Sequence, residues 1–344
     1  MLFPFAEYWW AYAAFTGLVL LLLALDLGVF HRRAHVVSMR EAALWTVIWV
    51  SLSLLFNWGL YEYARWAFAA DSRLMATPGF DPQAAASRAG LEFLAGYVVE
   101  KSLAVDNIFV FVVVFSFFAV PQALQHRVLF YGILGALLFR GAFIALGAAM
   151  IGHPWVLWVF GGFLIVTGIK LLAMPGLNAQ PERNPLVGLV RRIVPVTPDY
   201  HGARFFLRIG GVLHATPLLL ALVTIELSDI IFAVDSVPAI FALTSEPLIV
   251  YTSNVCAILG LRSMYFLLAG AVDKFALLRF GLAFVLMFVG LKMIWLNDWF
   301  DGKFPVTWSL AIITALVGGS IVASLIADRH QRHRRRQDEL AAKA

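Results

Sequence analysis

Charged residues are scarce in this sequence, and cysteine is nearly absent. Only 14% of the residues are charged, whereas 61% are hydrophobic, and a soluble domain typically has about 25% charged residues. A chain of this composition would expose too much apolar surface to water, which excludes an ordinary soluble protein. The single cysteine, Cys256, excludes an internal disulfide and a cysteine-rich metal centre.

The amino-terminal segment lacks the positive charge and the small-residue cleavage site of a secretory signal, so we expect it to remain as a membrane span. Nine segments are apolar over about 20 residues, the length that crosses a bilayer. They lie near residues 8–30, 41–64, 91–118, 126–150, 153–173, 212–242, 247–269, 276–296 and 305–327. The predicted fold class is an all-α polytopic membrane protein with nine transmembrane helices.

Lys and Arg are distributed unevenly between the loops. If the amino terminus lies outside, the inner segments hold seventeen of the 26 basic residues and the outer segments hold four. Because cytoplasmic loops collect positive charge, we expect an outside amino terminus and a cytoplasmic carboxyl terminus in the bacterial inner membrane. The basic tail after residue 327 then rests on anionic membrane lipids, and we expect no nucleic-acid partner.

An internal repeat divides the chain. "EKSLAVDNI" from Glu100 matches "DIIFAVDSV" from Asp229 at an offset of 129, and two later matches follow at offsets of 125 and 122. Each copy holds three spans, and an odd number of spans reverses the orientation between copies, which predicts inverted repeats typical of secondary transporters. We expect two amino-terminal helices and an outer loop (1–90), repeat 1 (91–173), a cytoplasmic loop (174–208), repeat 2 (209–296), and a last helix with its tail (297–344).

Five carboxylates lie inside the spans that begin the two repeats. They are Glu100, Asp106, Glu226, Asp229 and Asp235. An ionised side chain at the membrane centre costs at least a few kcal/mol, so these groups should face a shared polar cavity, be protonated or hold cations. We expect Pro238 to unwind the helix near Asp235 and to free backbone carbonyls for an ion.

Two roles are open for these acids. Together with the amide and hydroxyl oxygens of Asn107, Asn254 and Ser236, they form the oxygen-rich set that suits manganese, magnesium or calcium. The acids could instead be structural partners of basic residues within the spans, since Arg140, Arg262, Lys101 and Lys292 are available for pairing. Glu226 has no counterpart in the first repeat, where Tyr97 takes its place.

The chain also resembles a known family. "EKSLAVDNIFVFVVVFSFFAVP", "QHRVLFYGILGALLFR" and "ELSDIIFAVDSVPAIFALT" are similar to sequences of the TerC/Alx family of integral membrane proteins. The resemblance covers nearly the whole chain and implies nine spans and a role in metal-ion homeostasis, chiefly manganese efflux. It also implies that the family's acidic residues correspond to the five carboxylates of the two repeats.

We therefore expect a secondary transporter that exports a divalent cation, with Mn²⁺ as the transported ion, by alternating access. Burial raises the pKa of a carboxylate, so protons are expected as the counter-ion. The expected ligands are Glu100, Asp106, Asn107, Glu226, Asp229 and Asp235. We expect no enzymatic activity and no organic cofactor. The alternative is a membrane assembly factor that works with the secretion machinery; a passive channel is less favoured, because dense carboxylates hold ions too tightly.

Overall fold

The computed structural model describes residues 1–25, 37–150, 154–173, 194–269, 277–300 and 304–341. Helices dominate this part of the chain. They are α1 (Phe5–Leu25), α2 (Met39–Ala70), α3 (Ser72–Met75), α4 (Pro82–Phe117), α5 (Gln122–Met150), α6 (Pro154–Ala173), α8 (Pro217–Phe241), α9 (Pro247–Leu259), α10 (Leu261–Leu268), α11 (Leu278–Leu291), the π-helix η4 (Lys292–Leu296), α12 (Asn297–Trp299) and α13 (Val306–Ala341). The strands β1 (Phe206–Ile209) and β2 (Val212–Ala215) form a short antiparallel hairpin.

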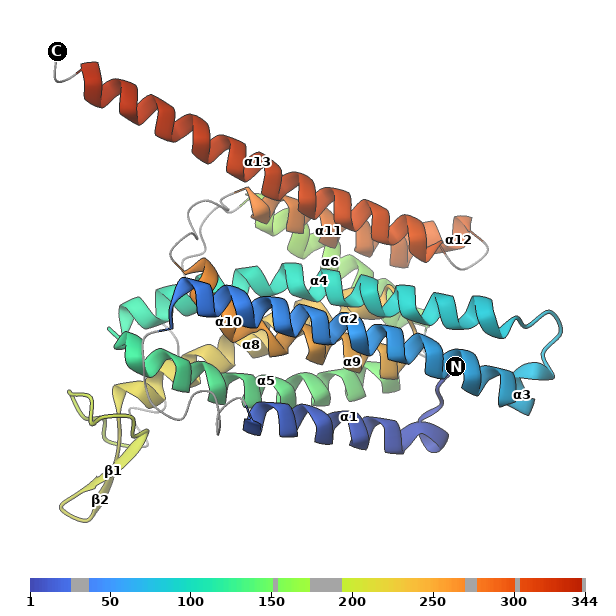
Figure 1. Ribbon diagram of the computed structural model, residues 1–344, viewed down its shortest axis with the longest axis horizontal. Coiled ribbons are helices and arrows are strands. Elements are labelled where there is room, and N and C mark those ends of the chain that lie inside the picture. Colours follow the sequence, from blue (N-terminus) through green and yellow to red (C-terminus); the bar gives the residue numbers. More distant parts are fainter. Residues whose placement is uncertain (26–36, 151–153, 174–193, 270–276, 301–303, 342–344) are drawn as a thin grey trace.

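The long helices run along one common direction, with α3 and α12 at one end of the bundle and β1 and β2 at the other (Figure 1). Helix α4 packs against α2, α8 and α9, and α5 packs against α8 and α9. Helix α6 packs against α11, and α13 covers α11 and α4. Helices α4 and α8 therefore lie inside the bundle, whereas α1 and α13 form opposite flanks in this view.

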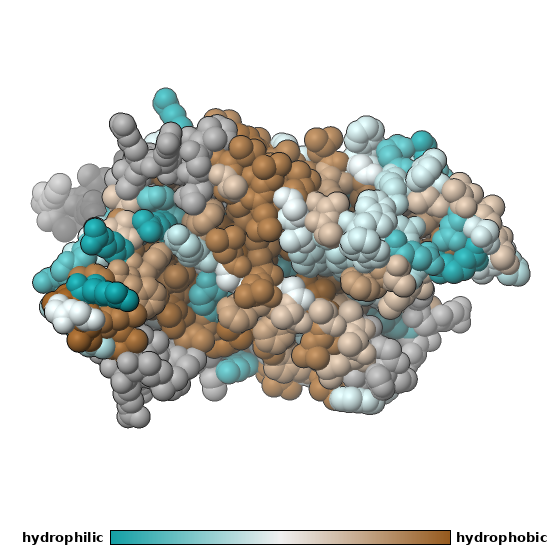
Figure 2. Space-filling model, turned by 90° about the horizontal axis from the view of Figure 1, so that it is seen from below, coloured by the Kyte–Doolittle hydropathy of each residue, from teal (hydrophilic) through white to brown (hydrophobic). Residues whose placement is uncertain are grey.

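The surface of the bundle is that of a multi-pass membrane protein. Among the described residues, five helices are long and apolar enough to cross a membrane, or six if the bent pair α9 and α10 is one span. Hydrophobic residues dominate the middle of the face in Figure 2, and hydrophilic residues lie toward its two ends. The other predicted spans coincide with α4, which carries several charges, and with the shorter apolar segments of α6 and α11–η4. A total of nine crossings remains a prediction.

Local signals explain where several helices begin. Ser38 caps α2 in a reciprocal pair with Glu41, in which each side chain accepts the other residue's backbone N–H. Asp81 caps α4 through the amides of Gln83 and Ala84. Helices α4, α8 and α9 each have proline in the first turn, where the missing N–H costs no hydrogen bond.

The expected unwinding at Pro238 is wrong. Helix α8 continues through Pro238 to Phe241, and the amide of Ala242 donates to the Pro238 carbonyl at 3.0 Å. The proline lies within the last turn of the helix, where the loss of one backbone donor is tolerated. A bend of 40° is found instead between α9 and α10, at Gly260.

The predicted start of the sixth span, residue 212, is also wrong. Residues 206–215 form the β1–β2 hairpin, and α8 begins only at Pro217. Gly210 and Gly211 have φ angles of 59° and 83°, which make the tight turn between the strands possible. Hydropathy alone did not separate the apolar hairpin from the helix that follows it.

Candidate functional site

Six polar side chains meet inside the bundle, and we call them the buried polar cluster. Its members are Glu100 and Asn107 of α4, Arg140 of α5, Asp229 and Ser236 of α8, and Asn254 of α9. None of these residues is more than 5% exposed. The cluster therefore joins both predicted repeats in a region that water barely reaches.

Arg140 lies at the centre of the cluster and binds both carboxylates. Its Nη2 donates to Asp229 Oδ1 at 3.0 Å, and its Nε donates to Asp229 Oδ2 at 3.3 Å. Its Nη1 forms an ion pair with Glu100 Oε1. A guanidinium group presents its donors in a planar fork that suits such two-point contacts with a carboxylate.

Two amides complete the hydrogen bonding of the carboxylates. Asn254 Nδ2 donates to Glu100 Oε2 at 3.2 Å, and Asn107 Nδ2 donates to Asp229 Oδ1 at 3.3 Å. Arg140 Nη1 also lies 3.3 Å from Ser236 Oγ and 3.4 Å from Asn254 Oδ1. Buried charges are tolerated when they are paired and hydrogen-bonded in this way.

The cluster contains one guanidinium and two carboxylates, so it has one net negative charge when both carboxylates are ionised. The structural alternative of the sequence analysis is thus realised for Glu100 and Asp229, because both are paired with a basic residue. The pairing leaves an excess of acid and several oxygen atoms that could contact a hard cation.

Glu226 lies outside this network. Its carboxylate lies directly on Gly135 of α5, so closely that a methyl group at position 135 would overlap it. Its Oε2 is buried and accepts no hydrogen bond from the protein. Glu226 stands three residues before Asp229, on the same face of α8. A buried carboxylate oxygen without a partner is costly, which singles out Glu226 as a position for a proton or a cation.

The remaining predicted ligands are not tested by the structure. The backbones of Asp106 and Asp235 belong to α4 and α8, but their side chains lie outside the described part of the chain. Among the side chains that are described, no three Asp, Glu, His or Cys residues form a group that could hold a metal ion. The structure thus brings Glu100, Asn107 and Asp229 together and places Glu226 apart from them.

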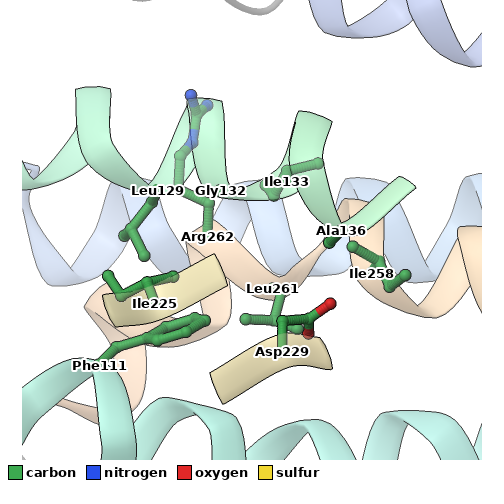
Figure 3. A pocket seen from close by; sticks show the side chains of 10 residues that line it. All are labelled: Phe111, Leu129, Gly132, Ile133, Ala136, Ile225, Asp229, Ile258, Leu261 and Arg262. Carbon is green, nitrogen blue, oxygen red and sulfur yellow. The ribbon is translucent and has the colours of Figure 1, made fainter. Parts of the chain in front are cut away.

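Two cavities with different lining residues reach the cluster. One, of about 340 Å³ with its open space, is lined by Asp229 and Arg262 together with apolar residues of α4, α5, α8, α9 and α10. Figure 3 shows Asp229 beside Ile225 and Leu261, with the guanidinium of Arg262 directed away from it. The second, of about 480 Å³, is lined by Glu100, Asn107, Arg140 and Ser236 with residues of α6 and α11.

Arg140 is the site residue that the sequence analysis missed. Arg140 appeared there only as an available partner for the acids, because it lies outside the repeated acidic motif. Its position in "ALLFRGAF" offers one signal, a lone arginine within an apolar run. A charge in such a place is a candidate for function by default, and the acids were its only plausible partners.

Comparisons with known proteins match a stretch of the chain that contains all residues of the cluster. Residues 85–332 match the family model described as "Integral membrane protein TerC family". An uncharacterized membrane protein of Myxococcus xanthus is 51% identical over 320 residues, which cover 93% of each chain. A protein of Escherichia coli K12 named "Putative membrane-bound redox modulator Alx" is 44% identical over 94% of this chain and 97% of its own. No solved structure matches.

Proposed function

This chain belongs to the TerC family of integral membrane proteins, and from this premise we propose that it exports a divalent metal cation, with Mn²⁺ as the first candidate, across the bacterial inner membrane. The observation that carries the proposal is the buried polar cluster. Glu100 and Asp229 occupy equivalent positions of the two repeats, and both lie in one water-poor site that two cavities reach. Acids at such depth are typical of ion pathways.

Helix contacts support the inverted-repeat arrangement within this proposal. The first copy consists of α4, α5 and α6, and the second of α8, α9–α10 and α11. In this arrangement α4 corresponds to α8, and α5 corresponds to α9. The contact between α4 and α9 then corresponds to the contact between α8 and α5, and both contacts are present. The contact between α6 and α11 maps onto itself.

Glycine contacts between α6 and α11 follow the same symmetry. A methyl group at Gly161 would lie 2.9 Å from the carbonyl oxygen of Gly290, and one at Gly168 would lie 2.7 Å from that of Ala283. The alignment at an offset of 122 pairs Gly161 with Ala283 and Gly168 with Gly290. Exchange of the two copies therefore converts one of these contacts into the other. This equivalence supports two copies related by a twofold axis in the membrane.

We assign the described conformation as closed toward the outside. At the end where α4 begins, Thr244 Oγ1 donates to Glu92, and the backbone amides of Leu2 and Phe3 donate to Glu246. The cavity beside Asp229 is lined by Phe111 and other residues of the opposite half of the bundle. In the orientation favoured by the positive charges, this half is cytoplasmic, where an exporter must load its ion.

Arg140 shapes the proposed transport step. It occupies the place between Glu100 and Asp229, so an incoming cation must share these carboxylates with the guanidinium or displace it. Glu226 stands on the same face of α8 as Asp229 and accepts no hydrogen bond at Oε2. We assign Glu226 to proton uptake or to a first contact with the ion, and Glu100 and Asp229 to its tight binding.

The word "redox" in the name of the relatives does not transfer readily to this chain. A thiol–disulfide exchange within one molecule needs two cysteines, and the chain has only Cys256, which is buried. Any redox effect of this protein would then be a consequence of the ion that it moves, and not of its own thiol.

A flux measurement with purified protein in liposomes tests the proposal. We expect Mn²⁺ uptake by wild-type protein and a faster rate when a proton gradient is imposed. Asp229→Asn should lower the rate at least tenfold while leaving the protein folded. Glu62→Gln, which changes a partly exposed acid of α2 that lies outside the cluster, is the matched control. A folded wild-type protein that moves no divalent cation would overturn the proposal and favour the assembly-factor alternative.

A further inference from the structure

The β1–β2 hairpin exposes apolar side chains at its tip and along its strands. Phe206, Ile209, Val212 and Leu213 are 47%, 47%, 54% and 46% exposed. Ile209 and Val212 are partners in the strand register and flank the two glycines of the turn. The hairpin therefore presents its most apolar point at its free end, where no described part of the chain covers it.

The base of the hairpin is held firmly against the bundle. Phe205 packs edge-on against Tyr131 of α5 at 5.1 Å between ring centroids, and the guanidinium of Arg127 lies 5.5 Å from the Phe205 ring. Thr216 Oγ1 donates to the Arg204 carbonyl at 2.8 Å, and Thr197 donates its amide to Ala215 at 2.9 Å. The exposure of the tip thus results from a fixed geometry.

The hairpin projects sideways from the bundle. In Figure 1, β1 and β2 leave the end opposite α3 and α12, and they point obliquely, partly across the direction of the long helices and partly beyond the end of the bundle. These helices are directed along the membrane normal in a multi-pass protein, so a sideways projection at one end lies over the surrounding lipid. Its anchor, Tyr131 with Arg127, belongs to the first turns of α5.

Basic residues accompany the apolar tip. Arg204 precedes β1 and Arg208 lies within it, and both are exposed. No acidic residue occurs between residues 200 and 225. Apolar side chains with adjacent arginines are the combination that binds an anionic lipid surface, because the apolar groups leave water while the guanidinium groups contact phosphates. A protein partner with an acidic rim would have the same chemistry, but lipid is already present beside this hairpin.

We infer that the β1–β2 hairpin is a lipid-surface anchor, which inserts Ile209 and Val212 into the interfacial layer of one leaflet while Arg204 and Arg208 contact anionic head groups. In the orientation proposed above, this leaflet is the cytoplasmic one, where anionic lipids concentrate. The anchor does not depend on metal transport. It would fix the loop that enters α8, and hence the first helix of the second repeat, relative to the membrane.

Site-specific fluorescence in lipid nanodiscs tests this anchor. Cys256 is buried, so Val212→Cys in the full chain can be labelled with a polarity-sensitive probe, with Cys256→Ser as background. Thr77→Cys, in the exposed turn after α3, is the matched control. In nanodiscs with anionic lipid, we expect brominated lipid to quench the label at position 212 at least threefold more than the label at position 77, and aqueous iodide to do the reverse.

A second variant excludes an effect of the probe itself. Arg204→Gln with Arg208→Gln should lower the brominated-lipid quenching at position 212 at least twofold, and wild-type hairpin in zwitterionic lipid should behave likewise. Equal iodide quenching at positions 212 and 77 would overturn the inference. Protection of position 212 in native membranes but not in nanodiscs would also overturn it, because a protein partner would then cover the hairpin.

Discussion

Arg140 holds Asp229 by two hydrogen bonds, from Nη2 to Oδ1 at 3.0 Å and from Nε to Oδ2 at 3.3 Å. Both side chains are almost inaccessible to water, so water molecules cannot take the place of either partner if the other is lost. The pair also joins α5 of the first predicted repeat to α8 of the second. A substitution at either residue therefore changes the hydrogen bonding of the other. It also affects Glu100, which is paired with the same guanidinium group.

Removal of the central cation should destabilise the protein strongly. Arg140→Gln leaves two buried carboxylates without their partner, and loss of one member of a buried ion pair typically costs about 3–5 kcal/mol. We expect a lower unfolding temperature in detergent. Arg73→Gln, at an exposed ion pair, should change it little. The double variant Arg140→Gln with Asp229→Asn should recover part of the loss, and an additive double variant would contradict this coupling.

Two glycines should respond differently to alanine. At Gly168 a methyl group would meet the backbone carbonyl of Ala283, which cannot move without shifting α11, so Gly168→Ala should lower the unfolding temperature clearly. At Gly135 the obstacle is the flexible end of Glu226. Gly135→Ala should therefore remain nearly as stable as wild type but move the Glu226 carboxylate. Liposome flux should fall to the level of Glu226→Gln; unchanged flux would separate Glu226 from transport.

Lys101 should stabilise the bend between α9 and α10. Its Nζ donates to the carbonyl of Ala257 at 3.1 Å, in the last turn of α9, and it lies beside Gly260 where the helix is interrupted. A cation at a helix carboxyl end satisfies carbonyls that have no partner within the helix. Lys101→Met should cost roughly 1.5–3 kcal/mol in thermal unfolding, and Lys101→Arg should cost less. Equal losses in both would indicate a packing role instead.

The turn between α2 and α3 should weaken in acid. Partial burial works to raise the pKa of Asp71, but the amides of Leu74 and Arg73 and the Arg73 guanidinium outweigh it and lower the pKa below 3.8. Because the folded-state pKa is the lower one, the stabilisation is present above the unfolded value and is lost as the pH falls through the folded value. Asp71→Asn should thus remove part of the acid sensitivity of the unfolding temperature below about pH 4. An unchanged pH profile would contradict this role.

The helical architecture was accessible from the sequence because long apolar runs leave few alternatives in a membrane. Runs such as Phe5–Leu25 and Gln122–Met150 coincide with predicted spans. The predictions that were wrong concern the ends of helices, where local sequence features matter more than hydropathy. The hairpin before Pro217 is as apolar as a helix start, and Pro238 lies too near the end of α8 to unwind it. The bend arose at Gly260, which the sequence analysis treated as part of one continuous span.

Only part of the site could be predicted from the sequence, because the remaining contacts depend on how the helices pack. The repeated motif identified Glu100 and Asp229 because each copy carries an acid at that position. The role of Arg140 depends on the rotation of α5 about its axis and on contacts between residues 89 apart in sequence. No periodicity encodes such a contact. The position of Glu226 over Gly135 likewise requires the packing of α5 on α8.

Within the proposed transport cycle, Arg140 has a consequence for the step in which the empty protein returns to its starting state. A carrier that has released its cargo must move its empty site back through the membrane, and bare carboxylates would make this step expensive. A guanidinium group already placed between Glu100 and Asp229 gives the empty site its own resident counter-ion. In the proposed cycle, the unloaded site then carries one net negative charge instead of two, so a single proton is enough to neutralise it before it returns. Backward leak of the transported ion is disfavoured as well, because the ion would first have to displace the guanidinium group.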